Sequence, residues 1–584
     1  MDNRRFLLAL ALSALVLFAY QFLVPTPPAK PVAGRPSPVV AAGAPAPSTT
    51  APSTPGVAAM PPGVPLPAPA ASAETVTVAG ARAAYRVSAQ GAALVGAEMK
   101  GYRNLHLGAA RQREGQPPVQ LARPGDALLA MRLAVAGDTI PLAATPFTVT
   151  RSPATAGGAE QVRFDGVARG RTGATAAGVP VSLTYSVLPD SFTLRVRGTV
   201  QAQGPAYLLV DLPPALATTE RDTVDHYNHL SFAWKPVARG AKGEAFGKLD
   251  PGERMLVSDS LTWAVAKSKY FLVGVLAPPG GRPFTELSLE GAPRTGKQAT
   301  RARGTLVVPV SNGSVGFDVY AGPQEWRRLA AQGREFETAN PYGGWLGGIV
   351  QPFATLAIRA ILWLHDNLKL GYGWVLVLLG VIVRLVLWPL QQNMMRNQIR
   401  MQRIQPEIQL VQQRHKNDPQ RLQQEMMKVY AEHGMSPLAP VTGCLPMLLP
   451  MPIFFALFFV FQNTIEFRGV PFLWLADISL KDPFYVLPVL VAATQFLISW
   501  IGMRGQPPNP QTQTVTYLMP AMFLIFFVNV AAGLNLYYLT QNLVMIPQQW
   551  LLARERLKAG ATPPTPPVQG TPARPAKNPK LRPA

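Results

Sequence analysis

The stretch Trp374–Leu390, WVLVLLGVIVRLVLWPL, is apolar over most of the thickness of a bilayer and holds a single charge, Arg384. An arginine at the middle of a membrane helix costs about 2.5 to 3.5 kcal/mol on translocon scales. A chain keeps such a residue when the guanidinium faces protein or water rather than lipid. A second interpretation is that Arg384, about seven residues from the cytoplasmic end of the run, extends out to the lipid headgroups.

The composition indicates a membrane protein. Of the 584 residues 48% are hydrophobic and only 15% are charged, with a formal net charge of +22. No Lys/Arg-rich block or zinc-finger spacing accompanies that charge, so DNA is not an expected partner. Basic cytoplasmic loops give a membrane protein the same excess, and the lipid bilayer is the expected surrounding. The single cysteine, Cys444, excludes an internal disulfide.

The N-terminal 73 residues predict an anchor and a linker. Phe6–Val24 carries no charge and follows Arg4 and Arg5, which is typical of a signal peptide or a signal anchor. Because no small-residue cleavage site follows closely, we expect residues 1–24 to form an uncleaved transmembrane anchor. Residues 25–73 are rich in proline and alanine and predict an extended linker.

Residues 74–325 are predicted to form a mainly β domain, most simply a β-sandwich, outside the cytoplasm. Polar and apolar residues alternate in Val181–Val187 and Phe192–Val200, as in half-buried strands. Shorter apolar runs separated by Gly, Pro and Asp are also typical of strands; they are Leu208–Leu212, Tyr270–Ala277 and Thr305–Val310.

Residues 326–372 are predicted to connect this domain to the membrane, and Trp345–Leu370 has the pattern of an amphipathic interfacial helix. A further span is the alternative. Residues 373–552 predict a five-helix transmembrane core. The spans are Gly373–Leu390, Leu445–Phe461, Phe484–Ile501, Val515–Ala531 and Leu534–Leu551.

Charge bias orients the spans. Residues 391–440 carry seven Lys/Arg against four acidic residues, and the tail 553–584 is also basic, so both are expected in the cytoplasm. Both termini are therefore predicted to be cytoplasmic. Residues 391–440 predict a cytoplasmic hairpin of two helices, the second beginning at Asp418-Pro419. The facing apolar residues are Ile404, Ile408 and Val411, and Leu422, Met426 and Val429.

Polar residues in several spans predict a hydrated groove around Arg384. Isolated in lipid such groups are costly, but together they can line one wet cavity, with the tyrosines as an amphipathic wall. The candidate groove residues are Arg384, Thr494, Gln495, Asn529, Asn535, Tyr537, Tyr538, Gln541 and Asn542.

Nothing predicts an enzyme. No span holds a histidine or an acidic residue, so a proton relay or hydrolase in the membrane is disfavoured. His226 and His229 have no third ligand at a usual metal spacing. The phosphate-loop-like Gly291–Gln298 lacks the Ser/Thr that would hold magnesium. We expect no catalytic residue, no metal and no cofactor.

The last 240 residues resemble the YidC/Oxa/Alb family of membrane protein insertases, in particular its bacterial, YidC-type branch. The resembling segments are Val383–Leu390, Met401–Ile408, Gly443–Leu457, Pro471–Asp477, Asp482–Pro488 and Gly533–Asn542. Weaker resemblance lies in Trp263, Lys269–Phe271 and Tyr320–Pro323. The chain departs from the family pattern in three places. The segment that leads into the second span of the core, Ser436–Cys444, is longer than usual, and prolines occur at Pro450 and Pro547. These departures put the local helix kinks in doubt.

The resemblance implies a fold and a function. The fold is a periplasmic β-supersandwich and a five-helix core in the bacterial inner membrane, with a groove open to cytoplasm and lipid. Arg384 would be the arginine of that groove, and substrate helices would slide past Tyr537 and Tyr538. The implied partners are nascent membrane proteins, the Sec translocon, and the ribosome through the basic tail and hairpin.

Two other functions remain open at this point. One is a small polytopic transporter or channel with a periplasmic β domain, although no internal repeat of the kind common in transporters is evident. The other places the function in the β domain itself, as a membrane-anchored carbohydrate-binding or chaperone module.

Overall fold

The computed structural model describes residues 74–106, 115–152, 160–171, 173–294, 296, 298–340, 347–415, 418–433, 451–504 and 510–560. The predicted anchor 1–24, the linker 25–73, Cys444, Pro450 and the tail after residue 560 lie outside these residues. The chain divides into two compact units. One comprises Met1–Ile358 with Phe455–Asp477, and the other Arg359–Phe454 with Ile478–Ala584.

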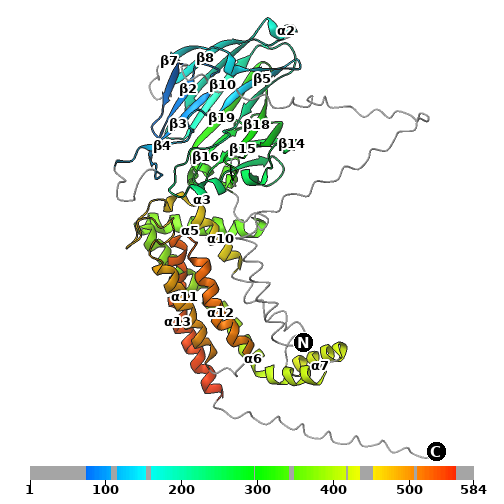
Figure 1. Cartoon of the computed structure of the whole chain (residues 1–584), viewed down its shortest axis with the longest axis vertical. Helices are drawn as coiled ribbons and strands as arrows, with labels where there is room; N and C mark the ends of the chain where they lie inside the picture. The colour runs from blue at the N-terminus through cyan, green and yellow to red at the C-terminus, as the bar shows by residue number, and fades with distance from the viewer. Residues whose placement is uncertain are drawn as a thin grey trace, which may run out of the picture. The chain divides into compact units, whose positions relative to one another are not determined.

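The β domain consists of three antiparallel sheets (Figure 1). The four-stranded sheet is, in order, β1 (Thr75–Ala79), β2 (Ala83–Ser88), β3 (Leu94–Arg103) and β4 (Pro118–Gln120). The six-stranded sheet is β14 (Arg254–Val257), β17 (Glu286–Gly291), β18 (Ala302–Pro309), β11 (Ala206–Asp211), β5 (Ala130–Val135) and β6 (Asp138–Pro141). The nine-stranded sheet is β13 (Lys242–Ala245), β12 (Ser231–Pro236), β15 (Leu261–Lys267), β16 (Phe271–Leu276), β19 (Ser314–Pro323), β10 (Thr193–Val200), β9 (Val179–Val187), β8 (Gln161–Ala168) and β7 (Thr148–Ser152).

The strands form where the apolar pattern predicts them. The two alternating segments are β9 and β10, which pair antiparallel with Tyr185 opposite Val196. In β9 every second side chain is buried, as expected for a strand with one face on the core. The continuous run Tyr270–Ala277 becomes β16, which is buried along its whole length. The prediction of a mainly β domain is therefore confirmed.

The core of this domain is continuous and rich in large apolar side chains. Trp263, Tyr85 and Phe271 are among its largest fully buried members. Ile465, which is more than a hundred residues further along the chain than the last strand, is also part of this core cluster. The short helices of the domain are η2 (Leu142–Ala144), α2 (Gly173–Ala176), α3 (Thr223–Asn228) and η3 (Phe246–Lys248), followed by α4 (Trp326–Ala331) and η4 (Phe336–Ala339).

Helix α5 (Gly347–Leu368) occupies the segment predicted to be amphipathic. Ala354, Ile358 and Ile361 are buried, whereas Leu356 and Trp363 are exposed and apolar. Exposed apolar residues of this size suit a lipid interface. The helix itself is confirmed, and its position in the interface stays a prediction.

Helices occur at each of the five predicted spans. They are α6 (Tyr372–Arg414), α10 (Met451–Asn463), α11 (Val486–Met503), α12 (Pro510–Phe527) and α13 (Ala532–Gly560). Within the described residues, Tyr372–Pro389 and Val486–Met503 are long and apolar enough to cross a membrane, and Pro452–Asn463 and Tyr517–Phe527 are shorter apolar helices. A helical core is therefore present, and the number of helices that cross the bilayer stays a prediction.

Two helices are longer than predicted. Helix α6 continues through Leu390 to Arg414, so the span and the first arm of the hairpin are one helix. Helix α13 continues past Pro547 and past residue 552 to Gly560. The added segments are rich in Gln, Met, Leu, Arg and Glu, which favour helix, and a change of polarity does not by itself end a helix.

The hairpin forms as the spacing predicts. Helix α7 (Pro419–Glu432) begins after Asp418, whose Oδ1 accepts the backbone N–H of Arg421 at 3.1 Å. The two arms pack through one small buried cluster, with a single predicted residue, Leu422, lying outside it. The cluster comprises Ile404, Ile408, Val429 and Tyr430, with Val411 and Met426 against it.

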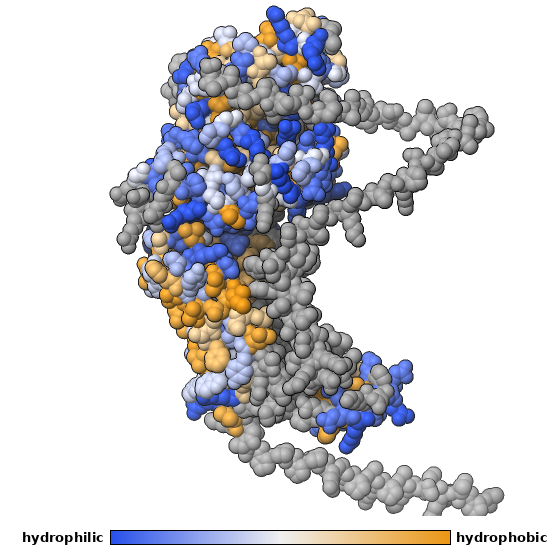
Figure 2. Space-filling model, in the orientation of Figure 1, coloured by the Kyte–Doolittle hydropathy of each residue, from blue (hydrophilic) through white to orange (hydrophobic). Residues whose placement is uncertain are grey.

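Exposed apolar side chains are concentrated on the helices. Figure 2 shows hydrophobic residues gathered over the helices α10 to α13, and mainly hydrophilic residues over the β domain and around α7. The exposed residues include Leu385, Val386, Phe496, Trp500, Ile525 and Leu543. Apolar surface of this extent on a soluble protein would be an aggregation liability, and on a membrane protein it is the face that meets lipid.

Candidate functional site

Three polar side chains follow one face of α13. Tyr537, Gln541 and Gln548 are separated by four and seven residues, which places them in one stripe along a helix. The Gln541 amide donates to the Tyr537 hydroxyl. Tyr537 is 2% exposed, so this face of α13 is turned into the protein.

Arg384 lies against this polar stripe. Its side chain on α6 is 4% exposed, and one terminal N–H group donates to Oε1 of Gln548 on α13. The guanidinium also lies within electrostatic range of the Tyr537 hydroxyl. The charge therefore faces protein, and the interpretation in which it extends to the headgroups is not supported by this geometry.

The surroundings of Arg384 leave hydrogen-bonding capacity unused. Nε of Arg384 and Nε2 of Gln548 are buried and have no hydrogen-bond partner among the residues that the structure describes. No carboxylate of the described residues forms an ion pair with Arg384. A buried polar atom without a partner costs about 1 to 3 kcal/mol unless water or a ligand satisfies it. The site is therefore suited to water and to an anionic group.

A glycine brings the two helices together at this point. Gly380 lies one turn before Arg384 on α6, and a Cβ added there would lie 3.2 Å from Cβ of Thr540 on α13. The absent side chain lets the backbones approach, as small residues do at helix contacts in membranes. This contact places the Arg384 guanidinium within reach of Gln548.

Tyr537 and Tyr538 differ in their surroundings. Their rings meet edge to face with centroids 5.3 Å apart. Tyr538 also contacts the rings of Phe454 and Phe527, at 5.5 Å and 5.2 Å. Tyr538 is partly exposed whereas Tyr537 is buried, so of the two rings that of Tyr538 is the more accessible.

A second polar contact joins α11 to α13. The Asn542 amide donates to Oγ1 of Thr494 at 3.1 Å and to the carbonyl of Val491 at 3.3 Å. Thr494 itself donates to the carbonyl of Leu490 at 2.7 Å. Gln495, the next residue on α11, is partly exposed. Thr494 and Asn542 therefore hold helices together.

Two predicted groove residues lie elsewhere. Asn535 is fully buried and donates to the carbonyl of Phe527 at 3.1 Å, so it closes the turn between α12 and α13. Asn529 is exposed in the same turn, where its Oδ1 accepts from Nζ of Lys481 at 3.3 Å. The hydrogen bonds that the described residues give to these two asparagines do not include one with Arg384. We expected all the polar groups to gather in one site because they all lie in predicted spans. They lie at different depths along the helices, however, and this separates them.

Gln548 is the residue that sequence reasoning missed. Its signal was present, because it continues the stripe of Tyr537 and Gln541 on α13. It was nevertheless not among the predicted groove residues, the last of which along the chain is Asn542. Among the described residues no group of three His, Cys, Asp or Glu side chains is placed to hold a metal ion.

A β domain followed by apolar helices with a buried arginine describes a membrane protein with a large domain outside the bilayer. Two family models match it: "YidC periplasmic domain" over residues 75–356 and "60Kd inner membrane protein" over residues 363–559. A membrane protein insertase YidC of Bordetella parapertussis is 31% identical over 84% of this chain and 85% of its own length.

A further relative, the membrane protein insertase YidC of Anaeromyxobacter sp., is 34% identical over 55% of this chain and 56% of that protein. A crystal structure described as an active YidC insertase with the first transmembrane domain resolved aligns over 82% of this chain and 93% of that one, at 19% identity and a TM-score of 0.31. The chain belongs to the YidC family of membrane protein insertases. It is an inner-membrane protein with a periplasmic domain, and its family is not one of enzymes.

Proposed function

We propose that this insertase moves nascent membrane proteins into the bilayer through a hydrophilic groove whose charged group is Arg384. The groove is formed on α6 and α13, with α11 beside them, and opens to the cytoplasm and to lipid. The observation that carries the proposal is a buried guanidinium that pairs with no carboxylate among the described residues. Within the same residues, its Nε and the neighbouring Nε2 of Gln548 are donors without an acceptor.

The physical reason for such a groove is the cost of moving charge through hydrocarbon. A polar tail that crosses the bilayer costs several kcal/mol for each charge. Water in the groove shortens the dry distance, and Arg384 attracts an acidic tail more strongly there than in bulk water because the dielectric constant is lower. The apolar segment that follows moves sideways past Tyr538 into lipid, driven by apolar burial.

The test replaces Arg384 by Ala and by Lys in the full chain, reconstituted in vesicles. Insertion of a substrate with an acidic translocated tail is expected to fall at least tenfold with Arg384→Ala and to be largely kept with Arg384→Lys. Gln548→Glu, which sets a carboxylate beside the guanidinium, is expected to reduce insertion of the same substrate. A substrate with an uncharged tail is expected to respond to none of these changes by more than about twofold.

The matched control is Arg504→Ala, since Arg504 follows α11 and stacks on Trp500 rather than entering the groove. Normal insertion of the acidic substrate by both Arg384 variants would refute the charge role. If Arg384→Lys loses insertion as Arg384→Ala does, the planar guanidinium with its several N–H donors is needed, because lysine supplies only a point charge.

The remaining assignments belong to the same proposal. The chain crosses the membrane six times with both termini in the cytoplasm, and the β domain is a supersandwich in the periplasm. The ribosome binds the hairpin and the basic tail, supported by the exposed side chains of Arg421 and Lys428. The Sec translocon delivers part of the substrates, and others are inserted without it.

A further inference from the structure

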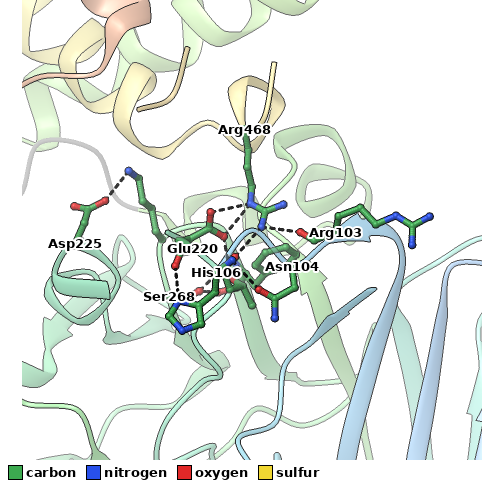
Figure 3. Close-up of polar contacts among 10 residues, drawn as sticks. Arg103, Asn104, His106, Glu220, Asp225, Ser268 and Arg468 are labelled. Atoms are coloured by element: carbon green, nitrogen blue, oxygen red, sulfur yellow. Dashed lines mark hydrogen bonds and ion pairs between the residues drawn. The ribbon is translucent and has the colours of Figure 1, made fainter. Parts of the chain in front are cut away.

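A loop residue, Arg468, is held inside the β domain by its charge. It follows η6 (Ile465–Phe467) in the connection between α10 and α11. Its Nε donates to both carboxylate oxygens of Glu220, at 2.8 and 3.0 Å (Figure 3). Its terminal nitrogen donates to the backbone carbonyls of Arg103 and Thr219, at 3.0 and 3.1 Å. The two charged side chains are 6% and 10% exposed.

The partners of Arg468 are themselves fixed. Glu220 accepts a further hydrogen bond from the Thr219 hydroxyl at 2.8 Å, and its backbone carbonyl contacts Nδ1 of His106 at 3.2 Å. The Arg468 guanidinium also lies 5.5 Å from the centre of the Phe271 ring, which belongs to the domain core. Charge-assisted bonds between buried partners of fixed position are strong and directional.

Apolar contacts attach the same loop segment. Ile465 is 4% exposed and joins the core cluster of the β domain. Phe467 is buried, and its ring lies 5.6 Å from the ring of Phe461 on α10. The end of α10 and the segment after it are therefore fastened by packing as well as by the ion pair.

The other end of the connection is attached to the start of helix α13. The backbone carbonyls of Ile478 and Leu480 accept from the N–H groups of Gly533 and Ala532, at 2.8 and 2.7 Å. Those residues begin α13, which carries the polar stripe of the candidate site. One connection thus has its first part fixed to the β domain and its last part fixed to the start of α13.

We propose that Arg468 and Glu220 form a clamp by which the β domain positions the extracytoplasmic connection between α10 and α11. Arg468 is in this proposal a positioning residue for insertion, because it acts on the groove helices through the connection and does not touch substrate. The effect on insertion rests on the proposed function above, whereas the attachment of the loop does not.

The experiment removes the pair without leaving a buried charge, by the double change Arg468→Met and Glu220→Gln in the full chain in nanodiscs. Hydrogen exchange of the peptide covering residues 464–468 is expected to become more than tenfold faster. Insertion of a substrate is expected to fall by about half, and Arg468→Lys, which keeps the charge, is expected to lie between the double variant and the parent.

The matched control is Arg132→Met with Asp211→Asn, a largely buried pair of the same chemistry at 2.6 Å between β5 and β11, with a further hydrogen bond to Thr305 on β18. It tests whether weakening the β domain alone releases the loop. Unchanged exchange at 464–468 in the Arg468 variant, or equal acceleration in the control, would overturn the clamp. Faster exchange with full insertion would overturn the positioning role. Loss of insertion in Arg384→Ala with normal insertion in the Arg468 variants would leave the proposed function standing.

Discussion

At the residue scale, Arg384 is a buried cation on α6 whose hydrogen-bond partner, Gln548 on α13, is uncharged. A lone arginine in an apolar run predicts a protein-facing or water-facing position, because lipid is costly, and its burial agrees with this. Its partner Gln548 lies 164 positions away, and only the packing of α6 on α13 reveals it. The stripe on α13 was visible in the sequence, but the register between two helices was not.

Glu466, also in the α10–α11 connection, gives a pH-dependent prediction. Its Oε2 is buried and has no hydrogen-bond partner in the described part of the chain. The pKa of Glu466 is raised to about 7, mainly by burial and also by the charge of Glu325, while a backbone hydrogen bond and Arg327 oppose the shift. The other groups facing this site are Tyr102, which donates to Glu325, and Arg328, which pairs with it.

The sign of the effect follows from the proton balance. Between the ordinary pKa of a glutamate, about 4.3, and about 7, the folded chain keeps a proton on Glu466 that the unfolded chain releases. Folding stability therefore falls as pH rises through this window and stays reduced above it. Glu466→Gln cannot ionise and is expected to be more stable than the parent at pH 8, by on the order of 1 kcal/mol, and equal to it near pH 4.5.

Thermal unfolding of the full chain in detergent at several pH values measures this difference. Glu74→Gln, at an exposed position of the same domain, is the control and is expected to leave the profile unchanged. A profile for Glu466→Gln that runs parallel to that of the parent from pH 5 to pH 8 would contradict the prediction.

At the element scale, local patterns located the helices and strands well and their ends less well. The cap at Asp418 and the apolar faces around Ile404 and Val429 are set by neighbours in sequence, so the hairpin was predictable. The end of α6 was not, because helix propensity continues beyond the polarity change at Leu390. The contacts of Asn529 and Asn535 were not predictable for a similar reason, since a span predicts membrane residence but not which turn of a helix faces which neighbour.

The close approach of α6 to α13 gives a prediction for Gly380. A Cβ there already lies 3.2 Å from Thr540, so Gly380→Leu must push the helices apart and lengthen the contact of Arg384 with Gln548. We expect Gly380→Leu to lower the unfolding midpoint, in line with overpacking costs of about 1 to 3 kcal/mol, and to reduce insertion of an acidic-tailed substrate several-fold.

The matched change is Gly502→Ala on α11, where the nearest atom to an added Cβ is 3.8 Å away. It is expected to be neutral or slightly stabilising, because alanine favours helix over glycine. Thermal unfolding and insertion are measured on both variants. Equal behaviour of the two would show that α6 and α13 do not need the gap at Gly380.

At the whole-molecule scale, the largest gap between sequence and structure is the attachment of the loop to the β domain. Arg468 and Glu220 are 248 positions apart, and each alone is an ordinary charged residue of a polar segment. Ile465 reads as an apolar residue at the end of a span and is instead part of the β-domain core. Contacts between residues so far apart in the sequence depend on the tertiary packing of the chain, which no local sequence pattern encodes.

The membrane topology is the whole-molecule property that the charges decide. Residues 391–440 have seven Lys/Arg against four acidic residues, whereas the connection after α10 holds Glu466, Asp477 and Asp482 against Arg468 and Lys481. Basic loops stay in the cytoplasm, so the hairpin and this connection are expected on opposite sides of the membrane.

The topology can be tested by labelling. In a Cys444→Ser background, Arg421→Cys and Lys481→Cys place a single thiol at an exposed position of each segment. A membrane-impermeant maleimide is expected to label Lys481→Cys in intact spheroplasts, and Arg421→Cys only after the inner membrane is permeabilised. Labelling of both thiols in intact spheroplasts would contradict this topology and, with it, a groove that opens on the side of the hairpin.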